Sequence, residues 1–434
     1  MNTIKLKPNL PSKLVTGISK TTTLGESILN GIIGDYLHHT SNGLSIDMQF
    51  FRNEQPLHLS KEKLKQYDSN LSPKICILIH GLLNNETTWN FADLDDVNYG
   101  TLLQNDFNYT PFYLRYNTGM HISENGRLLS QLMETLINEY PIEVEEILII
   151  AHSMGGLVAR SACHYAPIQG AAWINKISKL IFIGTPHLGA PLEKFGNVVT
   201  YLLKKIPVSY TRVSGDIINL RSSGIKDLRF GYLTDDDWKS HHPDQLLKNN
   251  KTTVPLLKQA DYFLITGTVS EKSESIANQW FGDALVLKAS ATGISKNKHH
   301  IPFNLKNHKE FTGIVHQKLV NQSVVYEQIR SWVSKRKKLL KPDPTAEFRF
   351  MRSKKEDYFL KINKDKKSKL DGLKILSADV FTESITKLEE LNRSRLAYKI
   401  LNHIPVLNVF SREIENTQVQ VVSKILKGIK SIVK

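Results

Sequence analysis

The stretch from Glu146 to Arg160 constrains the fold more than any other part of the chain. An apolar run ends at Ala151, and then His152, Ser153 and a pair of glycines precede a segment with helical spacing. This order of strand, tight turn and helix is the context of a nucleophile elbow, which lifts a serine oxygen off the end of a sheet. The turn needs small residues two positions before and after the serine. Ala151 and Gly155 stand there, with Ala151 in place of the usual glycine. The alternative is a glycine-rich strand-to-helix turn that carries no chemistry.

Apolar runs alternate with amphipathic segments from about residue 24 to residue 333. The residues from Ile122 to Tyr140 repeat apolar positions at helical spacing until Pro141 ends the helix. We expect buried strands at Ile75–Ile79, Ile147–Ile150, Leu180–Ile183 and Tyr262–Thr266. Strands that alternate with helices favour a mostly parallel central sheet covered on both faces. The sequence therefore predicts a three-layer α/β fold.

The chain divides into a central α/β domain and less regular flanks. The expected parts are an N-terminal arm over residues 1–23, the α/β domain over 24–333 with an insertion at 191–255, a linker at 334–344, and a Lys-rich, partly helical accessory region at 345–434. The insertion contains a short apolar segment around Tyr201 and Leu202, bordered by Lys204 and Lys205. An insertion between sheet strands at the catalytic end is where a lid would lie. The alternative is that these residues pack on the core.

The composition argues against a protein held by disulfides, a cysteine-based metal site or a membrane-spanning helix. A chain of 434 residues with 41% hydrophobic and 23% charged residues is typical of globular proteins with a large core. Cys76 and Cys163 are each expected to be small buried hydrophobes, because two cysteines provide neither a disulfide framework nor metal-ligand spacing. The first residues lack the apolar core of a signal peptide, and no apolar run reaches the ~18 residues of a membrane span. We therefore expect a soluble or membrane-peripheral protein of the cytoplasm.

The positive charge is concentrated in one segment. The formal net charge is +15, and residues Lys335–Lys374 carry 15 Lys or Arg against 6 Asp or Glu. Such a block favours an anionic partner, and the alternative is a solvated linker. Nucleic acid is the less favoured partner because aromatic residues do not alternate with the lysines. An anionic membrane surface is the favoured one.

The C-terminal residues form a second candidate for membrane contact. Apolar residues from Val421 to Val433 follow helical spacing, and lysines lie between them. A basic amphipathic helix of this kind suits a bilayer interface. Docking of its apolar face onto the protein itself is the alternative, and we favour docking.

A serine nucleophile needs a general base, and the base needs an acid that fixes its tautomer. Where the serine lies on a strand-to-helix turn, the partners follow in the chain order Ser, acid, His. Two downstream loops hold residues in that order. Asp283 lies in a Gly-Asp-Ala-Leu-Val run, and His316 precedes an expected closing helix at Val324–Val333. The sequence therefore predicts a triad of Ser153, Asp283 and His316.

Other residues compete for the roles of acid and base. Glu271, Glu274 and Asp261 flank the preceding expected strand and are the rival acids. Asp283 has the alternative role of a helix N-cap, since Asp begins many helices. His308, eight residues before the favoured histidine, is the rival base.

Acyl transfer also needs preorganised donors for the developing oxyanion. One donor is expected to be the N–H of Met154, directly after the serine. The other is expected in the loop after an early strand, where Gly81 allows a turn and the Leu82 N–H faces the pocket. We expect the His80 side chain to hold this loop by hydrogen bonding rather than to take part in catalysis.

Four further stretches complete a family likeness: Asn30–Leu37, Leu114–Gly119, Ile183–Pro191 and Arg221–Gly231. With the residues around Ser153, they resemble bacterial α/β hydrolases of the lipase and GPI-inositol-deacylase-like group, from about residue 24 to residue 333. The resemblance implies an α/β-hydrolase fold, triad positions at Ser153, Asp283 and His316, esterase or lipase activity, and no cofactor. Ala284 departs from the pattern, because such proteins often have a second glycine there.

Three functions fit these features. The first is a serine hydrolase that cleaves carboxylic esters of apolar or lipid-like acyl groups through an acyl-enzyme on Ser153. The second is a thioesterase, amide hydrolase or acyltransferase with the same triad. The third is a non-catalytic binding protein with a hydrolase fold, and the complete Ser-Asp-His set argues against it.

Overall fold

The computed structural model describes residues 12–52, 54–68, 70–92, 94, 96–190, 222–239, 251–268, 288–295, 299–335, 366–369 and 371, with the backbone alone for residues 12–22. The strands are β1 (Gln49–Arg52), β2 (Gln55–Pro56), β3 (Lys74–Ile79), β4 (Thr110–Arg115), β5 (Glu146–His152), β6 (Ile177–Ile183), β7 (Asp261–Thr268) and β8 (His308–Thr312). The α-helices are α1 (Ser12–His39), α2 (Lys61–Tyr67), α3 (Tyr99–Phe107), α4 (Ile122–Glu139), α5 (Met154–Gln169), α7 (Ser223–Phe230), α9 (Lys288–Ala291) and α10 (Ser323–Val333). Short 3-10 turns are η1 (Glu86–Trp89), η2 (Trp173–Lys176), η4 (Asp235–Asp237), η6 (Leu305–Asn307) and η7 (His316–Lys318).

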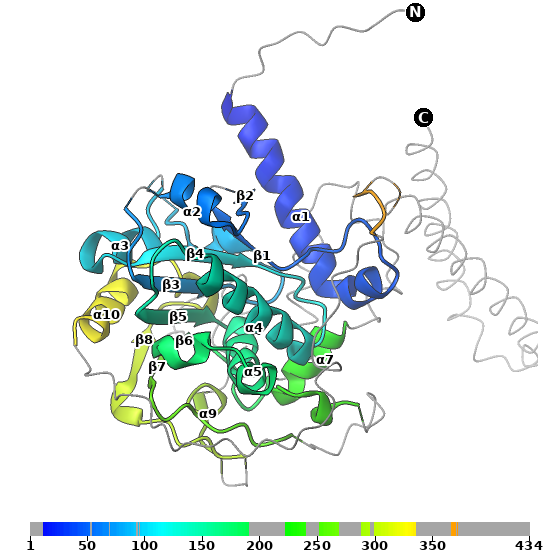
Figure 1. The fold of residues 1–434 in the computed structure, drawn as a ribbon. Coiled ribbons are helices and arrows are strands. Elements are labelled where there is room, and N and C mark those ends of the chain that lie inside the picture. The colour runs from blue at the N-terminus through cyan, green and yellow to red at the C-terminus, as the bar shows by residue number, and fades with distance from the viewer. Residues whose placement is uncertain are drawn as a thin grey trace, which may run out of the picture.

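The strands form one sheet of the order β2-β1-β4-β3-β5-β6-β7-β8 (Figure 1). The strands from β4 to β8 run parallel, and β1 pairs antiparallel with both β4 and β2 at one edge. The chain passes from β3 to β4 on one side and then crosses to β5 on the other side. This reversal is a topological switch point, and ligands of open α/β sheets bind beyond the carboxyl ends of the strands there.

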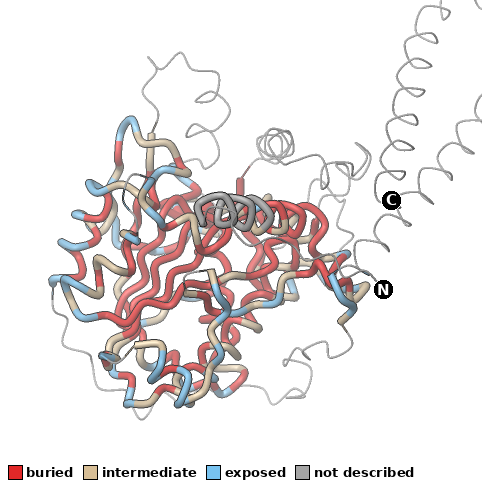
Figure 2. Tube along the Cα trace, turned by 90° about the horizontal axis from the view of Figure 1, so that it is seen from above, coloured by how far each residue is buried: buried red, intermediate tan, exposed pale blue. Residues whose placement is uncertain are grey.

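Helices cover both faces of the sheet. Alternate residues of β3 separate into two clusters, with Ile75, Ile77 and Ile79 on the face covered by α1, α4 and α5. Cys76 and Leu78 lie on the other face, which α3 and α10 cover. Figure 1 shows α4 and α5 side by side across the sheet, and Figure 2 shows that buried residues fill the strands and the helices packed on them.

The predicted three-layer α/β fold is confirmed. The four expected strands are β3, β5, β6 and β7, and each is one to three residues longer than its apolar run because the hydrogen-bonded ladder continues past it. The expected helix from residue 122 is α4, which ends at Glu139. Helix α1 begins at Ser12, inside the range expected to be an arm.

Several expected features fall outside the described residues. In the 191–255 insertion, only residues 222–239 and 251–255 are described, and they contain α7 and η4. The apolar segment around Tyr201 and the helix from Val421 to Val433 lie outside them. Both cysteines are buried and free. In the described ranges, no helix has the length and apolar character needed to cross a membrane, and no group of acidic, His or Cys side chains is arranged to hold a metal ion.

Part of the basic segment lies against α1 and the turn that follows it. Lys369 Nζ is 2.7 Å from Glu26 Oε1, and Lys366 Nζ is 2.7 Å from Asp47 Oδ2. The Lys367 N–H donates to the Ser41 carbonyl at 3.1 Å. Ion pairs at a surface stabilise by about 1 kcal/mol at most, so each of these two pairs contributes little by itself.

Candidate active site

Ser153 has the backbone conformation of a strained turn. It lies between the last residue of β5 and the first residue of α5, with φ 52° and ψ −124°. A residue other than glycine in this region costs about 1–3 kcal/mol, and such strain is concentrated at functional sites. The Ser153 N–H donates to the Ile183 carbonyl at 2.8 Å, which fastens the turn to the end of β6.

Helix α5 begins against the end of β3. An ideal Cβ on Gly155 would lie 2.6 Å from the Ile79 carbonyl oxygen, so only glycine allows this approach. Met154 is the first helical residue, where the backbone N–H has no acceptor within the helix. The partial positive charge of the helix end favours an anion at the same place.

The loop after β3 lies directly beside Ser153. An ideal Cβ on Gly81 would be 2.9 Å from Ser153 Cβ. His80 Nδ1 donates to the Gly81 carbonyl at 2.9 Å, and the Asn84 N–H donates to the same oxygen at 3.3 Å. Because the carbonyl of Gly81 and the N–H of Leu82 belong to one planar peptide and point in opposite directions, these bonds direct the Leu82 N–H away from His80.

His80 is suited to holding this loop. Its ring stacks on Tyr116 with 4.5 Å between centroids, and the Tyr116 hydroxyl donates to the His80 carbonyl at 2.9 Å. Burial lowers the pKa of His80 to about 3, so the ring is neutral near pH 7. These contacts agree with the expectation that His80 supports the loop.

His316 is the first residue of η7 and is buried at the same edge of the sheet. Its ring packs against Gly184. If Gly184 carried a side chain, the Cβ atom would lie 2.6 Å from both Cε1 and Nδ1 of the His316 ring. Gly184 has φ +60°, and its N–H donates to the Ile265 carbonyl at 2.8 Å. Burial lowers the pKa of His316 to about 4, which keeps the ring neutral and able to accept a proton.

The end of β6 brings Ser153 and His316 to one place. Ile183 bonds to the nucleophile turn and the next residue, Gly184, contacts the His316 ring. The ring of His152 packs against the ring of His316 with 4.7 Å between centroids. Ser153, Leu82, Met154 and His316, which were predicted from three separate segments, therefore lie beyond the carboxyl ends of the parallel strands.

Asp283 and the rival acids Glu271 and Glu274 lie outside the described residues. Asp261 opens β7, at the amino end of that strand, whereas the site lies beyond the carboxyl ends. His308 opens β8 and contacts Thr266 Oγ1 through Nε2 at 2.8 Å. These positions do not favour Asp261 or His308 over the predicted residues.

Helix α7 packs on the elbow from the side of α4 and α1. An ideal Cβ on Gly224 would lie 2.9 Å from Met154 Cε, so the start of α7 contacts the residue after Ser153. Ser223 bonds to Asp35 of α1 at 2.8 Å, and the Ser222 hydroxyl donates to the Gly31 carbonyl at 2.7 Å. The stretches Asn30–Leu37 and Arg221–Gly231, noted for their family likeness, thus meet beside the site.

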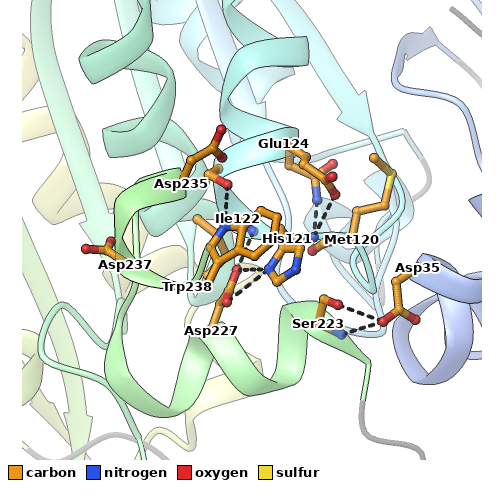
Figure 3. Close-up of polar contacts among 12 residues, drawn as sticks. Asp35, Met120, His121, Ile122, Glu124, Ser223, Asp227, Asp235, Asp237 and Trp238 are labelled. Atoms are coloured by element: carbon orange, nitrogen blue, oxygen red, sulfur yellow. Dashed lines mark hydrogen bonds and ion pairs between the residues drawn. The ribbon is translucent and has the colours of Figure 1, made fainter. Parts of the chain in front are cut away.

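A cluster of contacts around the buried Asp227, which we call the α7 anchor, holds the middle of this helix. It consists of His121, Ile122, Asp227 and Trp238 (Figure 3). His121 Nδ1 is 3.0 Å from Asp227 Oδ2, the Ile122 N–H donates to the same oxygen at 2.8 Å, and the His121 ring stacks on Trp238 at 3.7 Å. Burial opposes the charge on His121, but the hydrogen bond and charge of Asp227 raise its pKa above the ordinary value. Burial raises the pKa of Asp227, and His121 acts against that shift.

Comparison with known proteins shows which protein family part of the chain matches. Residues 71–260 match the family model described as a PGAP1-like alpha/beta domain. Comparison with curated protein sequences gives no significant match.

Among solved structures, the lipase BlEst2 of Bacillus licheniformis is 15% identical with a TM-score of 0.37, over 61% of this chain and 93% of that one. The esterase Pf2001 of Pyrococcus furiosus is 17% identical with a TM-score of 0.34, over 61% and 80%. The phospholipase PlaB from Legionella pneumophila is 16% identical with a TM-score of 0.32, over 50% and 45%. These values are low, so the assignment rests on the family match and on the sheet with its strand–Ser–helix turn. Residues 71–260 thus match a PGAP1-like alpha/beta domain, and the described residues have an α/β-hydrolase fold.

Proposed function

We propose that the protein is a serine esterase or lipase that cleaves carboxylic esters of apolar or lipid-like acyl groups. Ser153 is the nucleophile, His316 the general base and Asp283 the acid that orients it. The observation that carries the proposal is the strained conformation of Ser153, at φ 52° and ψ −124°, directly between β5 and α5. Strain of this kind persists only where the surrounding structure holds it, and here it falls on the serine that directly joins β5 to α5.

The proposed reaction is a two-step acyl transfer. His316 takes the Ser153 proton as the serine oxygen bonds to the ester carbonyl carbon, and the negative charge moves to the carbonyl oxygen. The N–H groups of Leu82 and Met154 stabilise that oxyanion. The C–O bond to the alcohol then breaks, and the alcohol leaves with the proton from His316. Water repeats the sequence on the acyl-enzyme and releases the acid.

Asp283 is assigned from the sequence order and the family likeness alone. Its expected effect on His316 is electrostatic. Burial holds the pKa of the His316 ring near 4, and a carboxylate against the ring would raise it toward the range of an effective base at pH 7. The acid thus gives the base both its orientation and its basicity.

The preference for apolar acyl groups rests on the apolar, lysine-bordered segment around Tyr201 in the insertion. An apolar lid suits an acyl chain. The Lys335–Lys374 segment and the C-terminal amphipathic helix add a proposed attraction to anionic lipid surfaces. Lys366 and Lys369 take part in ion pairs with α1 and the turn after it, so the membrane would compete with Asp47 and Glu26 for them.

A covalent probe tests the proposal directly. The full-length protein is treated with a fluorophosphonate and its intact mass is measured beside that of Ser153→Ala. We expect one adduct on the wild type and none on the variant. Hydrolysis of p-nitrophenyl esters of increasing chain length should then rise from acetate toward longer acyl groups. Labelling that persists in Ser153→Ala contradicts the choice of nucleophile, and turnover of thioesters alone would replace the esterase by a thioesterase.

A further inference from the structure

We propose that His152 is a positioning residue that holds the general base in register with the nucleophile. The inference rests on the proposed function, because it assigns a role within the same reaction. His152 is the last residue of β5 and immediately precedes Ser153, and its Nε2 lies 3.2 Å from the main-chain oxygen of His316. One side chain thus joins the strand that carries the nucleophile to the loop that carries the base, 164 residues further along the chain.

The partners of this contact fix the tautomer of His152. A carbonyl oxygen only accepts hydrogen bonds, so Nε2 is the protonated nitrogen and Nδ1 carries the lone pair. Burial lowers the pKa of His152 well below its ordinary value, and the neighbouring His316 acts in the same direction. The ring is therefore a neutral donor with its single proton directed at His316.

A neutral ring at this place is compatible with catalysis. In the proposed reaction His316 becomes positively charged, and the centroids of the two imidazole rings are only 4.7 Å apart. A second positive charge at that distance would destabilise the imidazolium. A neutral histidine holds the loop by a hydrogen bond without that cost.

The geometry separates positioning from a direct role as the base. The proton of Nε2 is used by the His316 carbonyl, and no described residue is hydrogen-bonded to Nδ1. An ideal Cβ on Gly81 would be 3.2 Å from Nδ1, so this nitrogen faces the main chain of the loop after β3. His152 therefore lies between the two loops that flank Ser153 and contacts both.

The loop that carries His316 is also held on both sides of the base. After it, the Tyr99 hydroxyl of α3 donates to the Leu319 carbonyl at 2.7 Å. The Gly313 N–H donates to the Thr268 carbonyl at 2.5 Å, three residues before the base. At His316 itself the described contacts are the packing of its ring on Gly184 and on His152, and the hydrogen bond from His152. A shift of a reacting group by about 1 Å costs on the order of 100-fold in rate. Loss of the His152 hydrogen bond is thus expected to appear in catalysis.

The test compares His152→Gln with His152→Met. The two side chains have the same length, but only Gln has an N–H near the position of Nε2. We measure kcat and KM on a p-nitrophenyl ester, the rate of fluorophosphonate labelling from pH 5 to pH 9, and Tm. We expect His152→Met to lower kcat and the plateau of the labelling rate by about 10- to 100-fold, with KM changed less than threefold. His152→Gln should restore most of that loss although the Tm values of the two variants are similar.

The result that overturns the inference is equal activity of His152→Met and the wild type, or equal loss in both variants at matched Tm. The latter would assign the effect to the imidazole ring itself. If His152→Met does not fold, the comparison of His152→Gln with the wild type still decides, because a ring-specific role predicts a large loss in the Gln variant. The proposed function fails separately: in that case the wild type itself is neither labelled at Ser153 nor active on esters.

Discussion

His316 and His121 are both packed into the protein beside the sheet, yet their surroundings give them opposite properties. His316 contacts Gly184 and another neutral histidine, and burial lowers its pKa to about 4. His121 lies against the carboxylate of Asp227, which raises its pKa above the ordinary value despite burial. The first environment disfavours a charge on the ring, and the second stabilises one.

The difference indicates which histidine is built for reaction and which for structure. A base must be neutral at the start of each turnover to accept the serine proton, so a pKa raised by a carboxylate suits it only while the resting ring stays unprotonated. In the α7 anchor the raised pKa of His121 favours a charged pair with Asp227, which ties α7 to the start of α4 and to Trp238. We therefore expect substitutions at the two histidines to affect different measurements.

The largest effect is expected from His316→Ala. Removal of the base should lower kcat for ester hydrolysis on the order of 10⁴-fold or more, while the oxyanion donors leave a residual rate. Asp227→Asn is the matched change in the α7 anchor. It should lower the free energy of unfolding by about 3 kcal/mol, because it removes one partner of a buried ion pair, and leave kcat within about threefold. If Asp227→Asn abolishes activity in the folded protein, the separation of the two regions is wrong.

More of the candidate active site than of the α7 anchor could be predicted from the sequence. Strands β3, β5, β6 and β7 were predictable because each contains at least four consecutive apolar residues. Strands β1, β2 and β8 have only two to five residues with exposed positions, and their pairing with neighbours decides their conformation. Ser153, Leu82 and His316 could be proposed from the sequence because each follows a strand or precedes a helix in a recognisable order. His121 and Asp227 are 106 residues apart with no local pattern, so only the packing of α7 on α4 joins them.

Gly184→Ala is expected to have a smaller effect on catalysis. This variant tests whether the contact with Gly184 holds the His316 ring in position. The new Cβ would lie 2.6 Å from the His316 ring and must displace it, so kcat should fall on the order of 100-fold. Gly170→Ala is the control, because Gly170 has a similar φ of +71° with nothing within 4 Å of its ideal Cβ. Both variants should lose about 1 kcal/mol of stability from strain. Equal activity of the two variants would show that the contact with Gly184 does not position the base.

The smallest effect is the pH dependence of the α7 anchor. The raised pKa of His121 means that the folded state binds more protons than the unfolded state above pH 6.5, so stability from this pair is complete below that pH and decreases as pH rises through the folded pKa. Glu124 and Asp35 also face His121 and shift its pKa in the same direction. His121→Asn keeps a donor near Nδ1 but does not titrate. The difference in free energy of unfolding between wild type and His121→Asn, measured in urea, should therefore shrink between pH 6 and pH 9. A constant difference would mean that folding does not change the pKa of His121, and a growing difference would mean that the folded protein favours the neutral ring. In either case the contrast with His316 would be one of hydrogen bonding rather than of charge.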